Sequence, residues 1–556
     1  MHKKRWYRRW WFILLISMMA LLTAGAIYLY VVAIVHPPQI ADRSSLELPR
    51  TEPSPGFYTI GNNWFRKSKS GLFEMYTEGK AFERGVINGK LSRELIVRQE
   101  DHFNAQIRNI IPSTVYLHFL KYFIGWFNRD LDDHVLDEYK EEIYGISFAA
   151  SAEYDYIGSG YQRMLNYHAA HDIGHALQSL ALVGCTSFAT WTPEAEGGSL
   201  IAGRNFDFYV GDAFAEDKIV AFVYPELGYK FMTITWGGFI GAVSGMNEKG
   251  LAITINAAKS DYPPGSATPV SLVAREILQY ASTISEAYAI AEKRKMFVSE
   301  SFMITSAEDH KAVIIEKTPE TIGLYDPNED FIICTNHFQS QQLLNTLPNQ
   351  EQMKESASVY RYNRVKELLE KIDSNTIGET VNLLRDQQGL GNADIGMGNE
   401  KAVNQLIAHH SIVFEPEKLR VWVSTSSWQL GPYVAYDLAR IFAMKGLSSD
   451  QEIIDENLTI PADSFLLSQD YRNFVLFRNM KARIAKEEWV EPDSLISLNP
   501  TYYHAYVLAG DLMYSKKDYA RASTYYKQAL TKEIATGYEE DYIQARITSC
   551  TKKEGK

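Results

Sequence analysis

Cysteine is scarce in this chain: its 556 residues include only Cys185, Cys334 and Cys550. The three lie far apart and show no CxxC or other metal-ligand spacing, so the sequence indicates neither a disulfide framework nor a cysteine metal site. Basic runs with interleaved aromatic residues are absent beyond the extreme N-terminus, and the net charge is −12. We therefore expect no nucleic-acid partner, and no motif indicates a cofactor.

Charged residues are also missing from one long segment, Trp10 to Val35, which exceeds the roughly 20 residues needed to cross a bilayer. Five basic residues precede it and His36-Pro37-Pro38 ends it. We expect residues 1–36 to be an uncleaved, single-pass signal anchor whose basic flank stays in the cytoplasm. A long signal peptide cut near Ala24 or Ala26 is the alternative. Either interpretation places the catalytic part outside the cytoplasm, for example in a periplasm.

With 46% hydrophobic and 22% charged residues, the chain can bury a large core in more than one domain. We expect a linker at 37–70, a helical prosegment at 71–184 and a catalytic domain at 185–430. In that domain, clusters of short strands bracket pairs of helices, a pattern typical of two antiparallel sheets with helices on their outer faces. The expected fold class is α+β, a four-layer αββα sandwich. The expected strands are 185–191, 199–206, 219–224, 230–235, 240–244, 251–256, 301–306, 312–316, 331–335, 410–414 and 419–424.

Beyond a helical connector at 431–498, residues 499–556 resemble a tetratricopeptide repeat (TPR). The small and aromatic positions of that repeat fall at Tyr506, Ala509, Gly510, Ala522, Tyr526 and Ala529. A single repeat cannot bury its own face, so we expect the helical stretch 471–486 to pack beside it. A cap on the catalytic domain and a surface for a protein partner are equally compatible with this pattern.

Gly184 and Cys185 form the most informative dipeptide. If the bond between them is cut, Cys185 gains an α-amine with a pKa near 8, which can accept the proton of the thiol of the same residue. Gly184 has no side chain to resist distortion of the scissile backbone. A buried, inert thiol is the default for an isolated cysteine, but the polar residues that follow favour catalysis.

Those polar residues lie at strand ends. Arg204 and Asp207, at i and i+3, are expected to hold each other, and Asp207 to accept hydrogen bonds from the amine or from a substrate. Asn256 offers a neutral amide as an oxyanion donor, and Asn336 offers a second. Each asparagine is equally typical of a turn.

Together these residues resemble the cysteine N-terminal-nucleophile (Ntn) hydrolases, a superfamily that includes bile-salt hydrolase, penicillin V acylase, acid ceramidase and the isopenicillin-N acyltransferase group. The resemblance covers roughly residues 70–430, and an upstream segment is similar to the prosegment of the acyltransferase group. It is carried by Cys185, Arg204-x-x-Asp207, the segment 245–251 leading to Asn256, Thr335-Asn336-His337, Ser358-x-x-Arg361-Tyr362, and upstream Glu83-Arg84-Gly85 with Gly89-Lys90-Leu91.

The resemblance implies an Ntn-hydrolase sandwich, autoproteolysis between Gly184 and Cys185, and hydrolysis or acyl transfer at a linear amide through a Cys185 thioester. It implies that Arg204 and Asp207 position Cys185, and that Asn256 and Asn336 are oxyanion or amine-binding amides. It also assigns Arg361 as a supporting charge, although Arg364 lies one helical turn away. The substrate expected is a small acyl amide of unspecified class, since the loop 257–269 suits an apolar cleft but identifies no ligand.

Two alternatives belong to other functional classes. The first is a metal hydrolase at His171 and His175, which share a helix face at i, i+4 near His168 and Asp172 but have no evident third ligand. His409 and His410 are expected on opposite faces of a strand, where they could not clasp one metal ion. The second is a non-catalytic, membrane-anchored scaffold that recruits a protein through its TPR-like tail.

Overall fold

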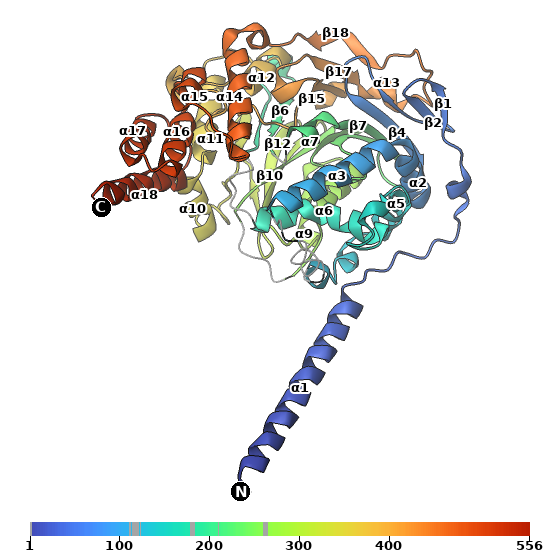
Figure 1. Ribbon diagram of the computed structural model, residues 1–556. Coiled ribbons are helices and arrows are strands. Elements are labelled where there is room, and N and C mark those ends of the chain that lie inside the picture. Colours follow the sequence, from blue (N-terminus) through green and yellow to red (C-terminus); the bar gives the residue numbers. More distant parts are fainter. Residues whose placement is uncertain are drawn as a thin grey trace.

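The computed structural model describes residues 3–110, 113, 122, 124–177, 184–208, 211–259 and 265–555. Two large sheets form its centre (Figure 1). The first has eleven strands, antiparallel at every junction except that of β4 with β7, which is parallel. In spatial order they are β1 (Thr51–Ser54), β2 (Phe57–Ile60), β3 (Asn63–Lys67), β4 (Phe73–Gly79), β7 (Ile219–Pro225), β8 (Phe231–Thr235), β9 (Ser244–Asn247), β10 (Leu251–Ala257), β11 (Glu300–Ser306), β12 (Lys311–Lys317) and β13 (Ile322–Tyr325).

The second sheet has seven antiparallel strands. One buried cluster contains Phe222 and Met303 of the first sheet together with Ile412 and Val423 of the second, so the two sheets pack face to face. The strands are β14 (Phe331–Cys334), β5 (Thr186–Thr190), β6 (Ile201–Phe206), β15 (His410–Glu415), β16 (Arg420–Ser424), β17 (Tyr433–Asp437) and β18 (Ile454–Ile460), in spatial order.

Helices cover the outer face of each sheet. On the eleven-stranded sheet, α8 (Val270–Tyr280) and α9 (Ile284–Lys293) share an apolar cluster with β10 and β11. On the seven-stranded sheet, α11 (Ser358–Leu369) and α12 (Ile377–Leu384) pack on β6 and β15. The layers follow the order α-β-β-α, in agreement with the α+β class expected from the pattern of strands and helices. Two short helices, α7 (Asp212–Glu216) and α13 (Leu438–Phe442), and α10 (Leu347–Glu355) complete this part.

The segment before Cys185 adds helices to the same outer layer as α8. They are α2 (Ala81–Leu91), α3 (Arg93–Ile110), α5 (Asp137–Ser147) and α6 (Gly160–Leu177). The helices α2 and α5 approach closely: a Cβ on Gly85 would lie 2.0 Å from the carbonyl oxygen of Glu142. Only glycine permits this approach, which gives Gly85 of the Glu-Arg-Gly motif a packing role. Most of the apolar stretch 110–127 lies outside the described residues.

Three of the expected segments differ from the structure. The expected linker 37–70 contributes β1, β2 and β3, because Phe57, Ile60 and Trp64 bury apolar side chains at the sheet edge despite the prolines around them. The expected helical connector 431–498 contains β17, β18 and α13 before α14 (Gln469–Ala485) begins. The strand expected at 240–244 is instead β9, which starts at Ser244. The domain limits themselves stay predictions.

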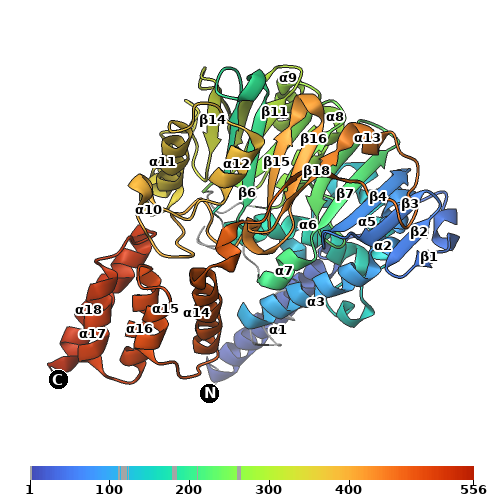
Figure 2. The ribbon, with the colours of Figure 1, turned by 90° about the horizontal axis from the view of Figure 1, so that it is seen from above.

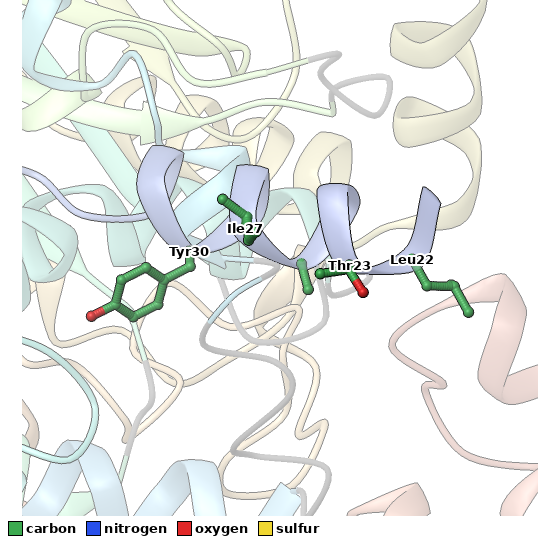
Figure 3. A pocket seen from close by; sticks show the side chains of 5 residues that line it. Leu22, Thr23, Ile27 and Tyr30 are labelled. Atoms are coloured by element: carbon green, nitrogen blue, oxygen red, sulfur yellow. The ribbon is translucent and has the colours of Figure 1, made fainter. Parts of the chain in front are cut away.

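The N-terminal helix α1 (Lys3–Val32) projects from the rest of the molecule (Figure 1). Its Trp10–Val32 segment has a mean hydropathy of 2.3 and none of it is buried. Leu22, Thr23, Ile27 and Tyr30 line a shallow hollow on this bare helix rather than a site near Cys185 (Figure 3). By length and composition α1 is able to cross a membrane, and a signal sequence near an N-terminus has the same properties.

The C-terminal helices stand in a row beside α14 (Figure 2). They are α15 (Pro492–Leu498), α16 (Tyr503–Ser515), α17 (Tyr519–Ala529) and α18 (Gly537–Glu554), and they share a core that includes Phe477 of α14. A Cβ on Gly510 would lie 2.6 Å from the Tyr526 ring, so these two positions face each other. Asn499 exchanges hydrogen bonds with the backbone of Met397, which fixes this row to the loop between α12 and β15.

Candidate active site around Cys185

Cys185 lies directly before β5 and is 1% exposed. The backbone N–H of Gly184 donates to the carbonyl oxygen of Asp207 at 3.0 Å, and the Cys185 thiol is 4.0 Å from the same oxygen. β5 pairs with β6 in the register Ser187 to Arg204, so the peptide before the thiol is held against the end of β6. The sheet pairing therefore brings the cysteine and the Arg-x-x-Asp segment together, as the sequence predicts.

Arg204 reaches the sulfur from β6. Its Nη2 donates to Cys185 Sγ at 3.6 Å and to the carbonyl oxygen of Ile255, and its Nη1 donates to Val243 O at 2.6 Å and to Ser244 Oγ. Burial raises the pKa of the Cys185 thiol, and the guanidinium opposes that rise. Arg204 is thus fixed by backbone carbonyls with its charge directed at the sulfur, where it favours the thiolate.

Asp207 does not form the expected ion pair with Arg204: no such pair joins the two described side chains. β6 ends at Phe206, so Asp207 lies just outside the strand that carries Arg204. Both carboxyl oxygens of Asp207 are buried and accept no hydrogen bond from any described residue. Burial raises the pKa of Asp207 to about 7, although Arg361 and Arg204 lower it. The carboxyl group can therefore exchange a proton near neutral pH.

Arg361, on α11, binds the backbone of Cys185. Its Nη1 donates to the carbonyl oxygen of Cys185 at 2.6 Å and to Thr186 Oγ1 at 2.8 Å, and its Nη2 donates to Asn336 Oδ1 at 2.7 Å. Arg364 instead forms an ion pair with Asp386. The structure thus separates the two arginines, and Arg361 is the one that lies against Cys185.

Asn256 contacts Ser187 and Asn336 contacts Arg361, both close to Cys185, but their amide donors are already engaged. Asn256 accepts from Ser187 Oγ at 2.9 Å and donates to Cys334 O at 3.0 Å and to Thr335 O at 3.3 Å. The Asn336 amide donates to Ala257 O at 2.9 Å. Both amides connect β10 to β14 in this form, so their oxyanion role stays a prediction.

Two further residues at the site were missed by sequence reasoning. Gln405 donates from Nε2 to the carbonyl oxygen of Gly184 at 2.7 Å. It belongs to the long loop between α12 and β15 and carries no sequence signal. Glu300, the first residue of β11, is buried with both carboxyl oxygens unpartnered among the described residues, and burial raises its pKa well above the usual value, with Asp172 adding to the rise. The available signal was an acid in a strand that has no other charged residue.

The histidines give no described metal site. His168 is satisfied by Met164 O at 2.8 Å and by the N–H of Ile240 at 2.9 Å, which is a packing role. The side chains of His171 and His175 lie outside the described residues, as does Tyr262-Pro263-Pro264 of the expected substrate loop. Within the described part of the chain, no group of three or more potential ligands could hold a metal ion.

The sequence led us to expect His409 and His410 on opposite faces of a strand, but in the structure their side chains approach each other. Their Nδ1 atoms are 2.8 Å from each other. β15 begins only at His410, so the alternation of a strand does not apply to His409.

Several known proteins are similar to this chain. In *Archaeoglobus fulgidus* an uncharacterized protein is 22% identical over 50% of this chain and 52% of its own length. The N-acylethanolamine-hydrolyzing acid amidase of *Caenorhabditis elegans* is 21% identical over 39% of this chain and 62% of its own length. The chain thus spans about half to three fifths of the length of these curated relatives.

Solved structures of similar proteins include a *Caenorhabditis elegans* N-acylethanolamine-hydrolyzing acid amidase ortholog, with 18% identity, a TM-score of 0.30, and coverage of 42% of this chain and 93% of its own. A conjugated bile acid hydrolase from *Clostridium perfringens* has 14% identity, a TM-score of 0.32, and coverage of 50% and 97%. Residues 194–427 match the family described as acyl-coenzyme A:6-aminopenicillanic acid acyl-transferase, so the resemblance to the isopenicillin-N acyltransferase group of Ntn hydrolases is confirmed for that region.

Proposed function

We propose that this protein is a self-activating cysteine amidohydrolase or N-acyltransferase. The observation that carries the proposal is that residues from distant segments converge on Cys185. Arg204 donates to the sulfur, and Arg361 donates to the carbonyl oxygen of Cys185. The backbone carbonyl oxygen of Asp207 lies against both the thiol and the N–H of Gly184. A merely structural thiol has no need of two buried guanidinium groups around it. The match of residues 194–427 to an acyl-transferase family supports the same chemistry.

In the proposed reaction, cleavage between Gly184 and Cys185 frees the α-amine of Cys185. That amine takes the thiol proton, and the thiolate attacks the carbonyl carbon of an acyl amide. The amine product leaves with a proton, and the acyl group stays on sulfur as a thioester. Water then gives hydrolysis, and an acceptor amine gives acyl transfer. Fatty-acyl amides, bile-acid amides, acyl amino acids and β-lactam side chains are the candidate substrate classes.

Cys185 is almost fully buried in the uncut chain, so cleavage must precede substrate entry. The cut separates α6 and everything before it from the strand that carries the nucleophile. We infer that α1 anchors the protein in a membrane with the catalytic part outside the cytoplasm, since a bare apolar helix preceded by basic residues suits that orientation.

Intact mass under denaturing conditions tests the proposal. The parent chain should give two fragments, the second beginning at Cys185, while Cys185→Ala should give one unbroken chain. A Cys185→Ala chain that still splits at this bond would contradict the assignment of the nucleophile. An unbroken parent would contradict self-activation.

A further inference from the structure

Three hydrogen bonds fix the backbone of Gly184 and Cys185, on either side of the bond between them. The N–H of Gly184 donates to Asp207 O, the carbonyl oxygen of Cys185 accepts from Arg361, and the carbonyl oxygen of Gly184 accepts from Gln405 Nε2 at 2.7 Å. Gln405 is 3% exposed and Gly184 is buried. The carbonyl oxygen of Gly184 would become negatively charged during cleavage, and it thus already accepts a hydrogen bond from a buried, neutral amide.

We propose that Gln405 is the oxyanion donor for self-cleavage at Cys185, an inference that rests on the proposed self-activation. The Cys185 thiol adds to the carbonyl carbon of Gly184, forming the C–S bond and placing negative charge on the oxygen that Gln405 contacts. Collapse of this intermediate breaks the C–N bond, and the thiol proton ends on the new α-amine. Water then cleaves the thioester, leaving a Gly184 carboxylate and a free thiol.

The distance and chemistry of the contact suit this role. An oxyanion donor acts best at 2.7–3.1 Å from the oxygen that gains charge, in a site that excludes water. The Gln405 amide meets the distance in the uncut chain and lies in a buried environment. By contrast, the donors of Asn256 and Asn336 are occupied by backbone carbonyls.

Gly184 and Gln405 also fit each other sterically. A Cβ on residue 184 would lie 2.3 Å from Nε2 and 2.5 Å from Oε1 of Gln405. The amide is the far end of a flexible side chain, so an alanine there would displace it rather than prevent folding. Glycine before the nucleophile is therefore required by the close approach of this amide, in addition to its backbone freedom.

The loop around Gln405 is built to hold it. The backbone N–H of Asn404 donates to Asp386 O at 2.8 Å, and its side-chain oxygen accepts from the N–H of Leu406 at 3.0 Å. Leu406 is fully buried beside Phe474 of α14. Earlier in the loop, Asn399 donates to Glu533 O in the C-terminal row. The amide is thus positioned through contacts from both the catalytic part and the tail.

Timed intact-mass measurements on the full chain test the proposal. Gln405→Met keeps the length of the side chain but has no N–H, and we expect it to slow cleavage by about 10²–10³-fold, as does Gln405→Ala. Gln429→Ala is the matched control: Gln429 is equally buried, but its amide donates to Leu384 O, so cleavage should keep the parent rate. Thermal midpoints measured in the Cys185→Ala background check that the Met variant folds.

Hydroxylamine, which cleaves thioesters, distinguishes a role of Gln405 in thioester formation from a role in the later cleavage of the thioester. If Gln405 acts in thioester formation, hydroxylamine leaves Gln405→Met slow. Restoration of the parent rate by hydroxylamine would place Gln405 after that step and overturn the proposal.

A double-mutant cycle provides the second test. Gly184→Ala should slow cleavage by displacing the amide, and Gly184→Ala/Gln405→Ala should be no slower than Gln405→Ala alone, because both act through one contact. Purely additive effects would contradict this. A parent that cleaves while both Gln405 variants keep its rate overturns the Gln405 role only, whereas a parent that never cleaves overturns self-activation and the Gln405 role together.

Discussion

Glu142 of α5 binds Arg275 of α8 through two buried hydrogen bonds, of 2.7 and 3.3 Å. Arg84 of α2 donates to the same carboxylate. Burial alone would raise the pKa of Glu142, but the two arginines together hold it below the usual value. Glu142 and Arg84 precede the proposed cleavage site and Arg275 follows it, so this charge cluster joins the two future fragments.

We therefore predict that the fragments stay associated after cleavage. In addition to this cluster, β4 pairs with β7 across the cut, which makes four strands of the first fragment part of the eleven-stranded sheet. Native size-exclusion chromatography of the cleaved protein should give one peak containing both fragments, and denaturant should separate them. Two peaks under native conditions would show that the prosegment is released.

Replacing Glu142 with Ala should strongly destabilise the fold. Two buried guanidinium groups would lose their carboxylate partner, a change that typically costs about 3–5 kcal/mol. The thermal midpoint of the uncleaved Cys185→Ala chain is the measurement, since it reports a single species. Glu94→Ala is the control: it removes an ion pair with Arg50 in which Glu94 is 58% exposed, and should cost at most about 1 kcal/mol.

Asp207 should give self-cleavage a pH dependence near neutrality. Its pKa of about 7 means that the carboxylate form, which can accept a proton, appears as the pH rises through that value. We expect the cleavage rate to rise between about pH 6 and pH 8, and Asp207→Asn to lose that inflection. An unchanged pH profile in Asp207→Asn would remove this carboxyl group from the reaction.

The same pKa predicts a stability effect with a defined sign. Because the folded-state pKa lies above the usual 3.8, the folded chain binds the extra proton between these values, and Asp207 lowers stability as the pH rises from about 4 to 7. We therefore compare the Cys185→Ala chain with the Cys185→Ala/Asp207→Asn chain. The thermal midpoint of the second should rise relative to that of the first as the pH increases from about 4 to 7. A difference that is constant with pH would contradict the raised pKa.

Substitutions at Arg361 and Arg364 should differ in their effects: the first should slow self-cleavage, and the second should lower the thermal stability. Arg361→Lys loses the hydrogen bonds to Cys185 O and Asn336, since a lysine ammonium cannot reproduce the planar fork, and cleavage should slow by orders of magnitude. Arg364→Lys weakens the ion pair with Asp386 and should lower the thermal midpoint while cleavage continues. Equal cleavage rates in the two variants would contradict the assignment of Arg361.

Deleting residues 1–36 should move the protein from the membrane fraction to the soluble fraction, because α1 is the one helix among the described residues that is long and apolar enough to cross a membrane. Resistance of the full chain to alkaline carbonate extraction checks the anchor directly. Mass analysis of the membrane-bound chain shows whether the N-terminus is kept. Loss of α1 from that chain would favour the alternative of a cleaved signal peptide.

The sequence predicted those parts of the fold in which local pattern and burial agree. The strands β5 and β6 match the expected ranges 185–191 and 199–206 closely, because each is a short run that is buried along its whole length. The prediction for residues 51–67 was wrong. Pro53 and Pro55 indicated a linker, whereas Phe57 and Trp64 lie in strands and are buried against the sheet beside them.

The sequence by itself indicated Cys185 as the proposed nucleophile together with most of the residues that lie around it, since the residue types in order along the chain already suggest the chemistry. Tertiary structure decided which of them touch. It placed Arg361 rather than Arg364 against Cys185, left the Asp207 carboxyl oxygens without a hydrogen bond from any described residue, and brought Gln405 to the carbonyl oxygen of Gly184 from a residue separation of 221. Such contacts depend on how loops cross between packed layers, and no local periodicity encodes that path.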